Sequence, residues 1–516
     1  MLSLWVNVSR LHAPLNRSAA KRSSNLSFTI PTEHFDILII GAGILGIGAA
    51  RHLQMDCADR TYAILEGRSS IGGTWDLFRY PGVRSDSDMD TLGYSFKPWE
   101  ERKAIADGPS ILKYVRETAT ENDIERHIRF GHREKGAAWE SADARWTVDV
   151  DVLDKQSEPK VPLQISCNFH FMCSGYCCYD EGFTPDFAGI ETFAGRVVHP
   201  QQWTDDVAYA GKRVVVIGSG ATAVTLVPEL AKKAAHVTML QRSPTYIVAR
   251  PSEDAIATNL KRWLPGKLAY GLTRGKQILL SLYIFQLCRR DPAKVKRLIE
   301  GGMRMALGPD YDVAKHFTPR YNPWDQRLCL APDGNFFAAI KSGSASVATD
   351  EIDCITATGI QLKSGAQLDA DLIVTATGLT LQVLGAVQLS VDGAVVDPAQ
   401  TLNYKGLMFS GVPNLAFSFG YTNASWTLRC DLTCEYVCRL LNHMKKHGLK
   451  QCTPFNTDAS ITEQPCVDFS SGYFARSLHL FPKQGSRAPW KLHQNYSKDI
   501  LLLRFGKVDD GVMQFA

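Results

Sequence analysis

The feature that most constrains this chain is a glycine-rich turn that occurs twice, each time between an apolar strand pattern and a helix pattern. Such a turn lets a pyrophosphate approach the N-terminus of the following helix. The first turn includes Gly41, Gly43, Leu45 and Gly46, and the second Gly218, Ser219, Gly220, Ala221, Thr222 and Ala223. We therefore predict an α/β fold with two Rossmann-like dinucleotide-binding domains.

The residues after the second strand of each unit predict different nucleotides. Glu66 ends that strand in the first unit, where a carboxylate can accept hydrogen bonds from both ribose hydroxyls. The second unit has Arg242 and Ser243 there, and a guanidinium favours the 2′-phosphate that distinguishes NADP from NAD. Two dinucleotides in one chain suggest electron transfer from nicotinamide to flavin, so we expect FAD on the first unit and NADPH/NADP+ on the second.

The order of the patterns predicts a discontinuous first domain. We assign residues 33-205 and 376-516 to the FAD-binding domain and 206-375 to an NADP-binding domain inserted into it. The insertion itself contains a mostly helical stretch, residues 253-317. Within that stretch, the apolar residues 277-288 are too few to span a bilayer and suit a buried or interfacial helix.

Charge is concentrated in a basic leader, residues 1-32, which has four Lys or Arg and no acid. The rest of the chain then has 53 basic and 53 acidic residues, so nothing favours a nucleic-acid partner. The leader has the composition of a mitochondrial transit peptide, and a disordered tail or an upstream start codon explains it equally well. Thirteen cysteines without regular spacing indicate an intracellular protein without a disulfide framework.

Electrons from a reduced flavin can pass to a disulfide or to O2. Cys173 and Cys178 have the C-x4-C spacing of flavin disulfide reductases, but they end a strand far from Glu66, after which a redox pair would be expected. A non-catalytic protein with the FAD fold would have no use for a second nucleotide turn. We keep both as alternatives and favour O2. Cys430, Cys434 and Cys438 share one helix face without a histidine, which favours core packing, and we expect no metal site.

The stretch GGTWDLFRYPGVRSD, residues 72-86, resembles the signature [AG]GxWxxxx[FY]P[GM]xxxD of Baeyer-Villiger flavoprotein monooxygenases at every fixed position. Phe193, Gly195, His199 and Trp203 resemble the family's FxGxxxHxxxW motif, and Thr204 departs from the residue usual there. The similarity runs from about residue 33 to the C-terminus. It is greatest to the subgroup of the ethionamide-activating monooxygenase and the AlmA-type long-chain alkane monooxygenases.

This resemblance implies roles for individual residues. Arg327 aligns with the family's catalytic arginine and Asp86 with the acid that orients it beside the flavin. His199 and Trp203 would act at the hinge between the domains, and Trp490 with Asn495 would lie near the nicotinamide or simply pack. The residues expected to line the cofactors are Leu45, Thr74, Trp75, Asp76, Leu77, Arg84, Ser85, Asp86 and Glu134, in addition to the two turns.

The resemblance also implies a reaction: a C4a-peroxyflavin inserts one oxygen atom from O2 into a small lipophilic ketone, giving an ester, with S-oxidation of thioethers as a further activity. Alternatives are oxidation of long-chain alkanes or fatty chains and N/S-oxygenation. We expect no obligate protein partner. The apolar helix suggests either a greasy substrate channel, a peripheral membrane contact or an ordinary buried helix.

Overall fold

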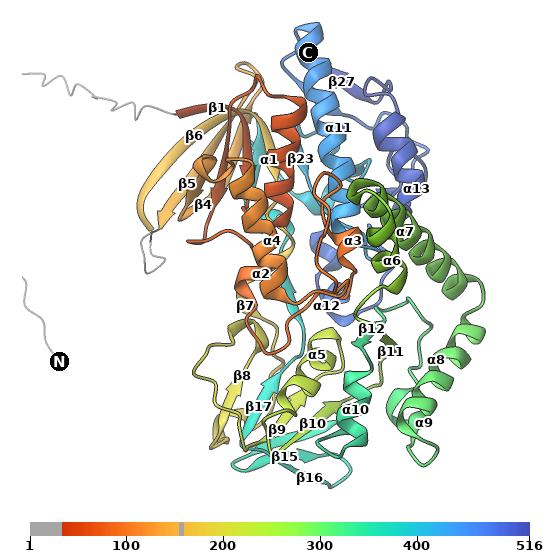
Figure 1. The fold of residues 1–516 in the computed structure, drawn as a ribbon. Coiled ribbons are helices and arrows are strands. Elements are labelled where there is room, and N and C mark those ends of the chain that lie inside the picture. The colour runs from red at the N-terminus through yellow and green to blue at the C-terminus, as the bar shows by residue number, and fades with distance from the viewer. Residues whose placement is uncertain (1–32, 154–158) are drawn as a thin grey trace, which may run out of the picture. The chain divides into compact units, whose positions relative to one another are not determined.

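The computed structural model describes residues 33–153 and 159–516 (Figure 1). The predicted leader, residues 1–32, lies outside the described residues. Within them, two separate β-sheets, each with its own helices, account for the two nucleotide turns. The predicted fold class, two Rossmann-like units with a helical insertion, is confirmed by this arrangement.

The first sheet has the order β20-β19-β4-β5-β6-β1-β2-β3, with β23 also paired to β6. A parallel core of β23, β6, β1, β2 and β3 continues into an antiparallel meander of β6, β5 and β4. Residues 37–40 of β1 are all buried, as expected for a central parallel strand covered on both faces. The strands are β1 (Glu33–Ile40), β2 (Tyr62–Glu66), β3 (Ile128–Phe130), β4 (His132–Glu140), β5 (Arg145–Leu153), β6 (Pro159–Met172), β19 (Gln388–Val391), β20 (Ala394–Val396) and β23 (Leu415–Phe417).

The second sheet is entirely parallel, in the order β13-β10-β9-β17-β8. Its strands are β8 (Arg196–Val198), β9 (Arg213–Ile217), β10 (His236–Gln241), β13 (Ala345–Thr349) and β17 (Leu372–Thr375). β8 precedes the expected domain boundary at residue 206 but pairs in this second sheet. The exact boundary between the two domains stays a prediction.

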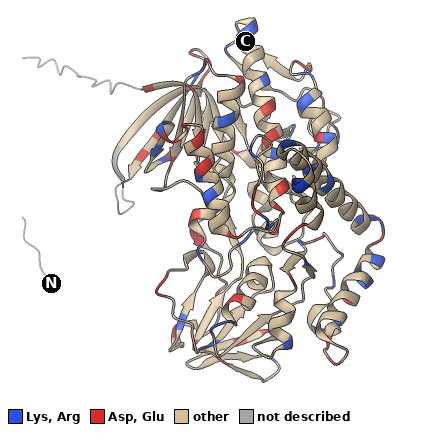
Figure 2. Ribbon diagram, viewed as in Figure 1, with Lys and Arg blue, Asp and Glu red and all other residues tan. Residues whose placement is uncertain are grey.

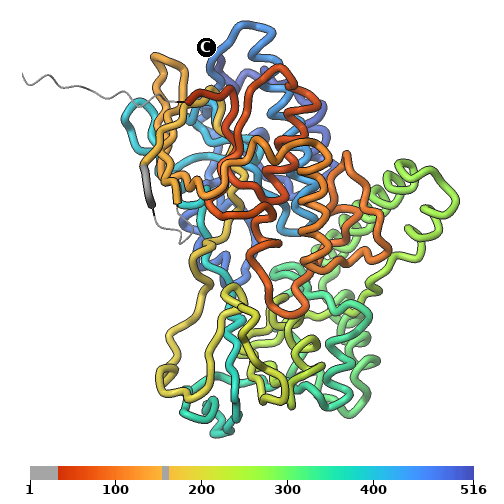
Figure 3. Tube along the Cα trace, turned by 60° about the vertical axis from the view of Figure 1, so that its left-hand side comes forward, coloured from red at the N-terminus to blue at the C-terminus, as the bar shows by residue number. Residues whose placement is uncertain are grey.

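Helices pack beside both sheets and also form the insertion (Figures 1 and 3). The stretch predicted to be helical, 253–317, contains α6 to α9. The helices are α1 (Ile44–Asp56), α2 (Thr74–Leu77), α3 (Met89–Leu92), α4 (Gly108–Glu121), α5 (Ala221–Leu230), α6 (Ala255–Trp263), α7 (Gly266–Arg290), α8 (Pro292–Leu307), α9 (Val313–Phe317), α10 (Asn335–Lys341), α11 (Trp426–His447), α12 (Gly472–Ser477) and α13 (Tyr496–Asp499). No helix of the described residues is long and apolar enough to cross a membrane.

Short two-stranded pairs and one three-stranded sheet, β14-β15-β16, complete the described fold. They comprise β7 (Cys177–Gly182), β11 (Ile247–Arg250), β12 (Cys329–Pro332), β14 (Ile352–Thr356), β15 (Gly359–Leu362), β16 (Gln367–Asp369), β18 (Leu379–Leu381), β21 (Asn403–Tyr404), β22 (Met408–Phe409), β24 (Cys452–Pro454), β25 (Glu463–Gln464), β26 (Gln484–Gly485) and β27 (Met513–Phe515). The helix α11 packs against α1 in the largest hydrophobic core. Cys430, Cys434 and Cys438 are buried there, which confirms the predicted packing role.

The chain passes between the two sheets twice, and the two passages lie side by side. The outgoing strand β7 pairs antiparallel with the returning strand β18. Beyond this ribbon, the backbone N–H of Phe183 donates to the carbonyl of Gly378 at 3.1 Å, and the Thr184 and Thr375 hydroxyl oxygens lie 3.2 Å apart. The second sheet is therefore attached through one paired connection.

Candidate active site and nucleotide sites

The glycines of the first turn have three different structural reasons to be glycine. Gly41 has φ of +100°, a conformation that other residues rarely adopt. A methyl group on Gly46 would overlap the carbonyl oxygen of Gly41, so this position allows the helix to pack closely on the strand. By contrast, a Cβ on Gly43 would meet no described atom closer than 3.7 Å. The open space at Gly43 lies at the start of α1, where a phosphate can approach the backbone.

The start of α1 has the features of an anion site. Gly43 caps the helix and provides no side-chain hydrogen bond, so its first N–H groups have no side-chain cap. Glu66 is buried at the end of β2, and its carboxylate accepts the N–H of Ala42 at 2.8 Å and that of Arg68 at 2.9 Å. Burial raises the pKa of Glu66, and these two hydrogen bonds oppose that rise. The turn and the predicted ribose-binding carboxylate are thus held together.

The signature stretch begins beside this turn. Gly72 forms an isolated β-bridge with Gly43, and its N–H donates to the carbonyl of Ala42 at 3.1 Å. Thr74 is exposed at the start of α2, whereas Trp75 packs against the core. The short helix α2 therefore lies next to the predicted flavin site, together with Leu77.

Asp76 differs from its neighbours because its carboxylate is already engaged. It accepts hydrogen bonds from Arg68 at 2.7 Å, Ser70 at 2.6 Å and Arg116 at 3.1 Å. Arg68 also donates to the carbonyl of Gly73 at 3.1 Å. The side chain of Asp76 thus fixes the loop, and contact with FAD, as predicted from the resemblance, would fall to its backbone.

The second turn repeats the geometry of the first. Gly218 has φ of +130°, and a Cβ on Gly220 would meet nothing within 4 Å. Gly220 caps α5 without a side-chain hydrogen bond, and Ala223 is buried in the place of the third glycine. The hydroxyl of Ser219 donates to the carbonyl of Ser243 at 3.2 Å. This bond joins the turn to the end of β10.

The exposed side chain of Arg242 lies beside this junction. Lys363 lowers the pKa of Glu351, burial acts in the opposite direction, and the positive charge of Arg242 adds a smaller lowering. Ala221 and Thr222 begin α5 in the same region. Arg242, Ser219 and Ser243 therefore surround the position that a 2′-phosphate would occupy.

The predicted catalytic pair meets where the signature stretch approaches β12. Asp86 is half-buried; burial raises its pKa, and the positive charges of Arg327 and Arg84 act in the opposite direction. Arg84 is fixed by donating to the carbonyl of Leu330 at 2.7 Å. Ser85 is buried next to them. Among the described residues, Asp86 and Arg327 form no direct ion pair, although their charges interact.

Three tyrosines that the sequence reasoning did not select complete this region. Burial raises the pKa of Tyr80 to about 12, with the hydroxyl of Thr222 hydrogen-bonded to it and Asp86 nearby. Tyr80 thus connects the second turn to Asp86. Burial also raises the pKa of Tyr176 and of Tyr473, and the charge of Arg327 opposes both shifts. The position of Tyr176 just beyond the C-terminal end of β6 was the available clue, since ligands of parallel sheets bind there.

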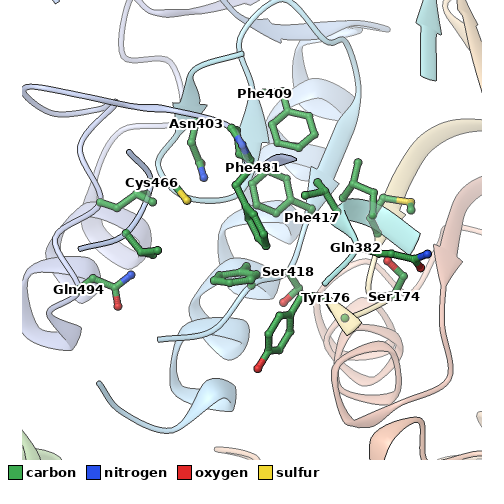
Figure 4. Close-up of a pocket in the computed structure, with 18 residues that line it drawn as sticks. Ser174, Tyr176, Gln382, Asn403, Phe409, Phe417, Ser418, Cys466, Phe481 and Gln494 are labelled. Atoms are coloured by element: carbon green, nitrogen blue, oxygen red, sulfur yellow. The ribbon is translucent and has the colours of Figure 1, made fainter. Parts of the chain in front are cut away.

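Tyr176 also lines an apolar pocket (Figure 4). The pocket has a volume of about 550 Å³ including its open mouth. Its walls are largely aromatic, from Phe409, Phe417, Phe419 and Phe481. The side-chain oxygen of the buried Asn403 in the wall has no hydrogen-bond partner among the described residues. An apolar space with a few polar groups is typical of a site for a small lipophilic molecule.

His199 lies at the paired connection between the sheets, and the hinge role expected of His199 and Trp203 stays a prediction. The Nε2 of His199 contacts the carbonyl of Gly378 at 3.0 Å, and its Nδ1 accepts the N–H of Gln201. Burial lowers the pKa of His199. The neutral ring with a proton on Nε2 satisfies both contacts. Trp203 is buried in the core of the second sheet.

Glu134 and Trp490 occupy positions that separate their side chains from the cofactor turns. Glu134 lies within β4, and its buried carboxylate is 3.0 Å from Nε2 of His170. The carboxylate is therefore engaged, and the predicted contact of Glu134 with a cofactor would fall to its backbone. Trp490 packs in the core with Tyr404, at 5.6 Å between ring centroids. Asn495 caps α13 by accepting the N–H of Lys498. These contacts give Trp490 and Asn495 structural roles.

The residues present therefore fit two dinucleotides. In each turn the first glycine has positive φ, and the second has free space around it at the start of a helix that has no side-chain cap. The third position of each turn is closely packed. The first turn is followed by a carboxylate suited to a ribose, and the second by a guanidinium suited to a phosphate. The signature stretch connects them, since a Cβ on Gly82 would overlap Glu229 of α5.

Comparisons with known proteins agree with this geometry. Residues 37–263 match the family "Flavin-binding monooxygenase-like". The FAD-containing monooxygenase EthA of Mycobacterium tuberculosis (strain ATCC 25618 / H37Rv) is 53% identical over 94% of this chain and 98% of its own length. The probable FAD-binding monooxygenase AlmA of Acinetobacter baylyi is 47% identical over 94% of this chain and 96% of its own length.

A solved structure titled OTEMO in complex with FAD and NADP has the same fold. The TM-score is 0.70 at 20% sequence identity, over 94% of this chain and 100% of that one. The predicted family and fold class are confirmed by these comparisons, and the predicted pair of cofactors agrees with the two cofactors of that structure. The chain belongs to the flavin-binding monooxygenase family and has the fold of a structure solved with FAD and NADP.

Proposed function

We propose that this enzyme inserts one oxygen atom from O2 into a small lipophilic ketone to give an ester. The observation that supports the proposal is that the charge of Arg327 acts on both Asp86 and Tyr176, and that Tyr176 lines an apolar pocket. When bound, FAD that has been reduced by NADPH supplies the activated oxygen. The side chains supply charge and the exclusion of water.

Arg327 is the residue suited to the negative charge that develops on a ketone oxygen during attack. A fixed cation in a water-poor site stabilises such charge without reorganisation. Tyr176 links this cation to the pocket, because it lines the pocket and also lies within the electrostatic influence of Arg327. A ketone in the pocket would therefore direct its oxygen toward the guanidinium.

Asp86 is proposed as a positioning residue for Arg327 and Arg84. The burial that raises the pKa of Asp86 also strengthens its interaction with the two guanidinium groups. Arg84 is already fixed by its bond to Leu330, so Asp86 would hold the second guanidinium in relation to the first. Its separation from Arg327 leaves the arginine free to contact substrate.

The pocket supports a lipophilic substrate of modest size. Its aromatic walls provide no charge. The side-chain oxygen of Asn403 has no partner among the described residues and leaves one hydrogen-bond acceptor free in the wall. A thioether would also fit these walls, and S-oxidation is proposed as a further activity of the same site. A long-chain alkane, in contrast to a ketone, has no carbonyl oxygen on which the negative charge that Arg327 would stabilise could develop.

Substitution of Arg327 tests the proposal most directly. Arg327→Ala should abolish ester formation while anaerobic reduction of the bound flavin by NADPH continues, because the cation is needed for oxygen transfer. Flavin absorbance measures the first half-reaction, and mass spectrometry of a ketone, a thioether and an alkane incubated with enzyme, NADPH and O2 measures the second. Arg320→Ala, at an exposed arginine nearby in sequence, is the matched control.

Two results would contradict the proposal. Ester formation by Arg327→Ala at a near wild-type rate would remove Arg327 from the reaction. Oxygenation of the alkane or thioether by the wild type, with no ester from any ketone tried, would show that the substrate class is wrong while the monooxygenase assignment stands.

A further inference from the structure

The insertion exposes an unusual number of large apolar side chains. They lie on α6, α7 and α8, which together we name the helical patch. Trp263 is 76% exposed and Met305 86% exposed, whereas side chains of these types are normally buried. The patch residues are Ile256, Trp263, Leu268, Leu272, Leu279, Leu280, Tyr283, Ile284, Leu298 and Met305. The three helices contact one another in sequence order, and large exposed apolar side chains gathered on neighbouring helices indicate an interaction site.

The apolar residues of α7 form a stripe on its outer face. Leu268, Leu272, Leu279 and Tyr283 recur at helical spacing and are 49–66% exposed. The sequence of residues 277–288 alone cannot tell an outer from an inner face, but the structure places Leu279 and Leu280 outward and Gln277 inward.

The inner face of α7 is fixed by polar contacts. The guanidinium of Arg274 is buried and donates to the carbonyls of Asp90 at 2.9 Å and Gly93 at 2.8 Å. It also pairs with the carboxylate of Asp431 on α11 at 3.2 Å. Rotating the helix to bury its leucines would break these bonds and leave a buried carboxylate with one partner fewer. The apolar stripe is therefore held outward by the fold.

The same segment is strongly basic. Residues 255–307 contain eleven Lys or Arg and two Asp or Glu, which gives this segment a net charge of +9. The whole chain has a net charge of +4, so the residues outside the segment carry −5. On α8, Lys294, Arg297 and Arg304 are exposed beside Leu298 and Met305. Figure 2 shows the blue of Lys and Arg along these helices. Basic side chains thus accompany the apolar ones on the same surface.

We propose that the helical patch binds the surface of a bilayer that contains anionic lipid. Exposed leucines with flanking Lys and Arg are the composition of helices that lie in the membrane interface. Trp263 and Tyr283 belong to the two residue types enriched at that depth. A second copy of this chain would bring +9 against +9, which disfavours self-association through the patch. The patch lies on the bilayer and does not cross it.

Vesicle co-sedimentation of the full-length, FAD-loaded enzyme tests the proposal. The wild type should sediment with vesicles of phosphatidylcholine and phosphatidylglycerol, much less with phosphatidylcholine alone, and less as salt increases. The double variant Leu279→Glu with Tyr283→Glu should bind at least tenfold more weakly. Val395→Glu with Leu501→Glu is the matched control, because these side chains are 69% and 66% exposed on other elements.

The charge contribution is tested by Arg297→Gln with Arg304→Gln. Each basic side chain near an anionic surface contributes roughly a fivefold factor in binding, so this variant should lose roughly twentyfold. Retained FAD and unchanged NADPH oxidation show that each variant is folded. Failure of the wild type to bind anionic vesicles, or equal loss for the patch and control variants, would overturn the proposal. A patch variant that alters oligomeric state without altering vesicle binding would overturn it in favour of a second copy.

Discussion

The two nucleotide turns make a sharp prediction at Gly220. Its φ of −75° and ψ of −178° are accessible to any residue, and a Cβ there would meet nothing within 4 Å. Gly220→Ala should therefore lower the free energy of unfolding only by a few tenths of a kcal/mol to about 1 kcal/mol, the difference between Gly and Ala at a helix cap. Any larger effect must come from what binds in the open space.

The effect on NADPH should be much larger. A methyl group in that space would keep the pyrophosphate away from the backbone N–H groups at the start of α5, which are charge-assisted donors. Loss of one such bond costs about 1.5–3 kcal/mol, which corresponds to a rise in the KM for NADPH of roughly 10- to 150-fold. Binding of FAD, on the other turn, should not change.

The comparison with Gly218→Ala distinguishes binding from folding. Gly218 has φ of +130°, and a methyl there would overlap the carbonyl oxygen of Ala376. This variant should lose more than about 1–2 kcal/mol of stability from backbone strain alone. Urea unfolding and NADPH-oxidation kinetics on both variants measure the difference. A wild-type KM for NADPH in Gly220→Ala, or a stability loss equal to that of Gly218→Ala, would refute the reasoning.

Two further predictions follow from single side chains. Arg242→Ala should raise the KM for NADPH at least tenfold and leave that for NADH unchanged, because only the former has a 2′-phosphate; equal effects on both would remove Arg242 from the site. Burial by itself would lower the pKa of His52, but the nearby carboxylates of Asp431 and Asp56 raise it to about 9. The stability that His52 contributes is thus complete below about pH 6.5 and is lost as pH rises through about 9. The difference in free energy of unfolding between the wild type and His52→Gln should shrink by about 3 kcal/mol over that range. Urea titrations at pH 6 and pH 9.5 measure this difference. An unchanged difference would contradict the ion pair.

The sequence predicted the parts of the site that depend on local backbone. Gly41 and Gly218 have positive φ because the turn between strand and helix requires it at these positions. This requirement is local, so the two turns could be predicted from the glycine pattern alone. The strand at residues 37–40 is readable for the same reason, because its apolar run reflects burial on both faces.

Residues brought together by tertiary contacts were less accessible. Tyr176 and Tyr473 are nearly three hundred residues apart, and both reach Arg327 only after folding. The carboxylate of Asp76 was expected at the flavin because of its place in the signature, but the chain supplies Arg68 and Arg116 to occupy it. A motif gives the position of a residue, while its neighbours in space decide what its side chain does.

The paired connection between the sheets has a topological consequence. Thr184 and Thr375 bound a stretch of nearly two hundred residues, yet their hydroxyls lie 3.2 Å apart. Because the segment between Thr184 and Thr375 begins and ends at neighbouring positions, the rest of the chain could be joined there without it. A short turn joining β7 directly to β18 would close this hairpin and leave every strand of the first sheet in the chain. The architecture is therefore that of one flavin-binding chain opened at a single hairpin, with the second nucleotide unit carried in the opening.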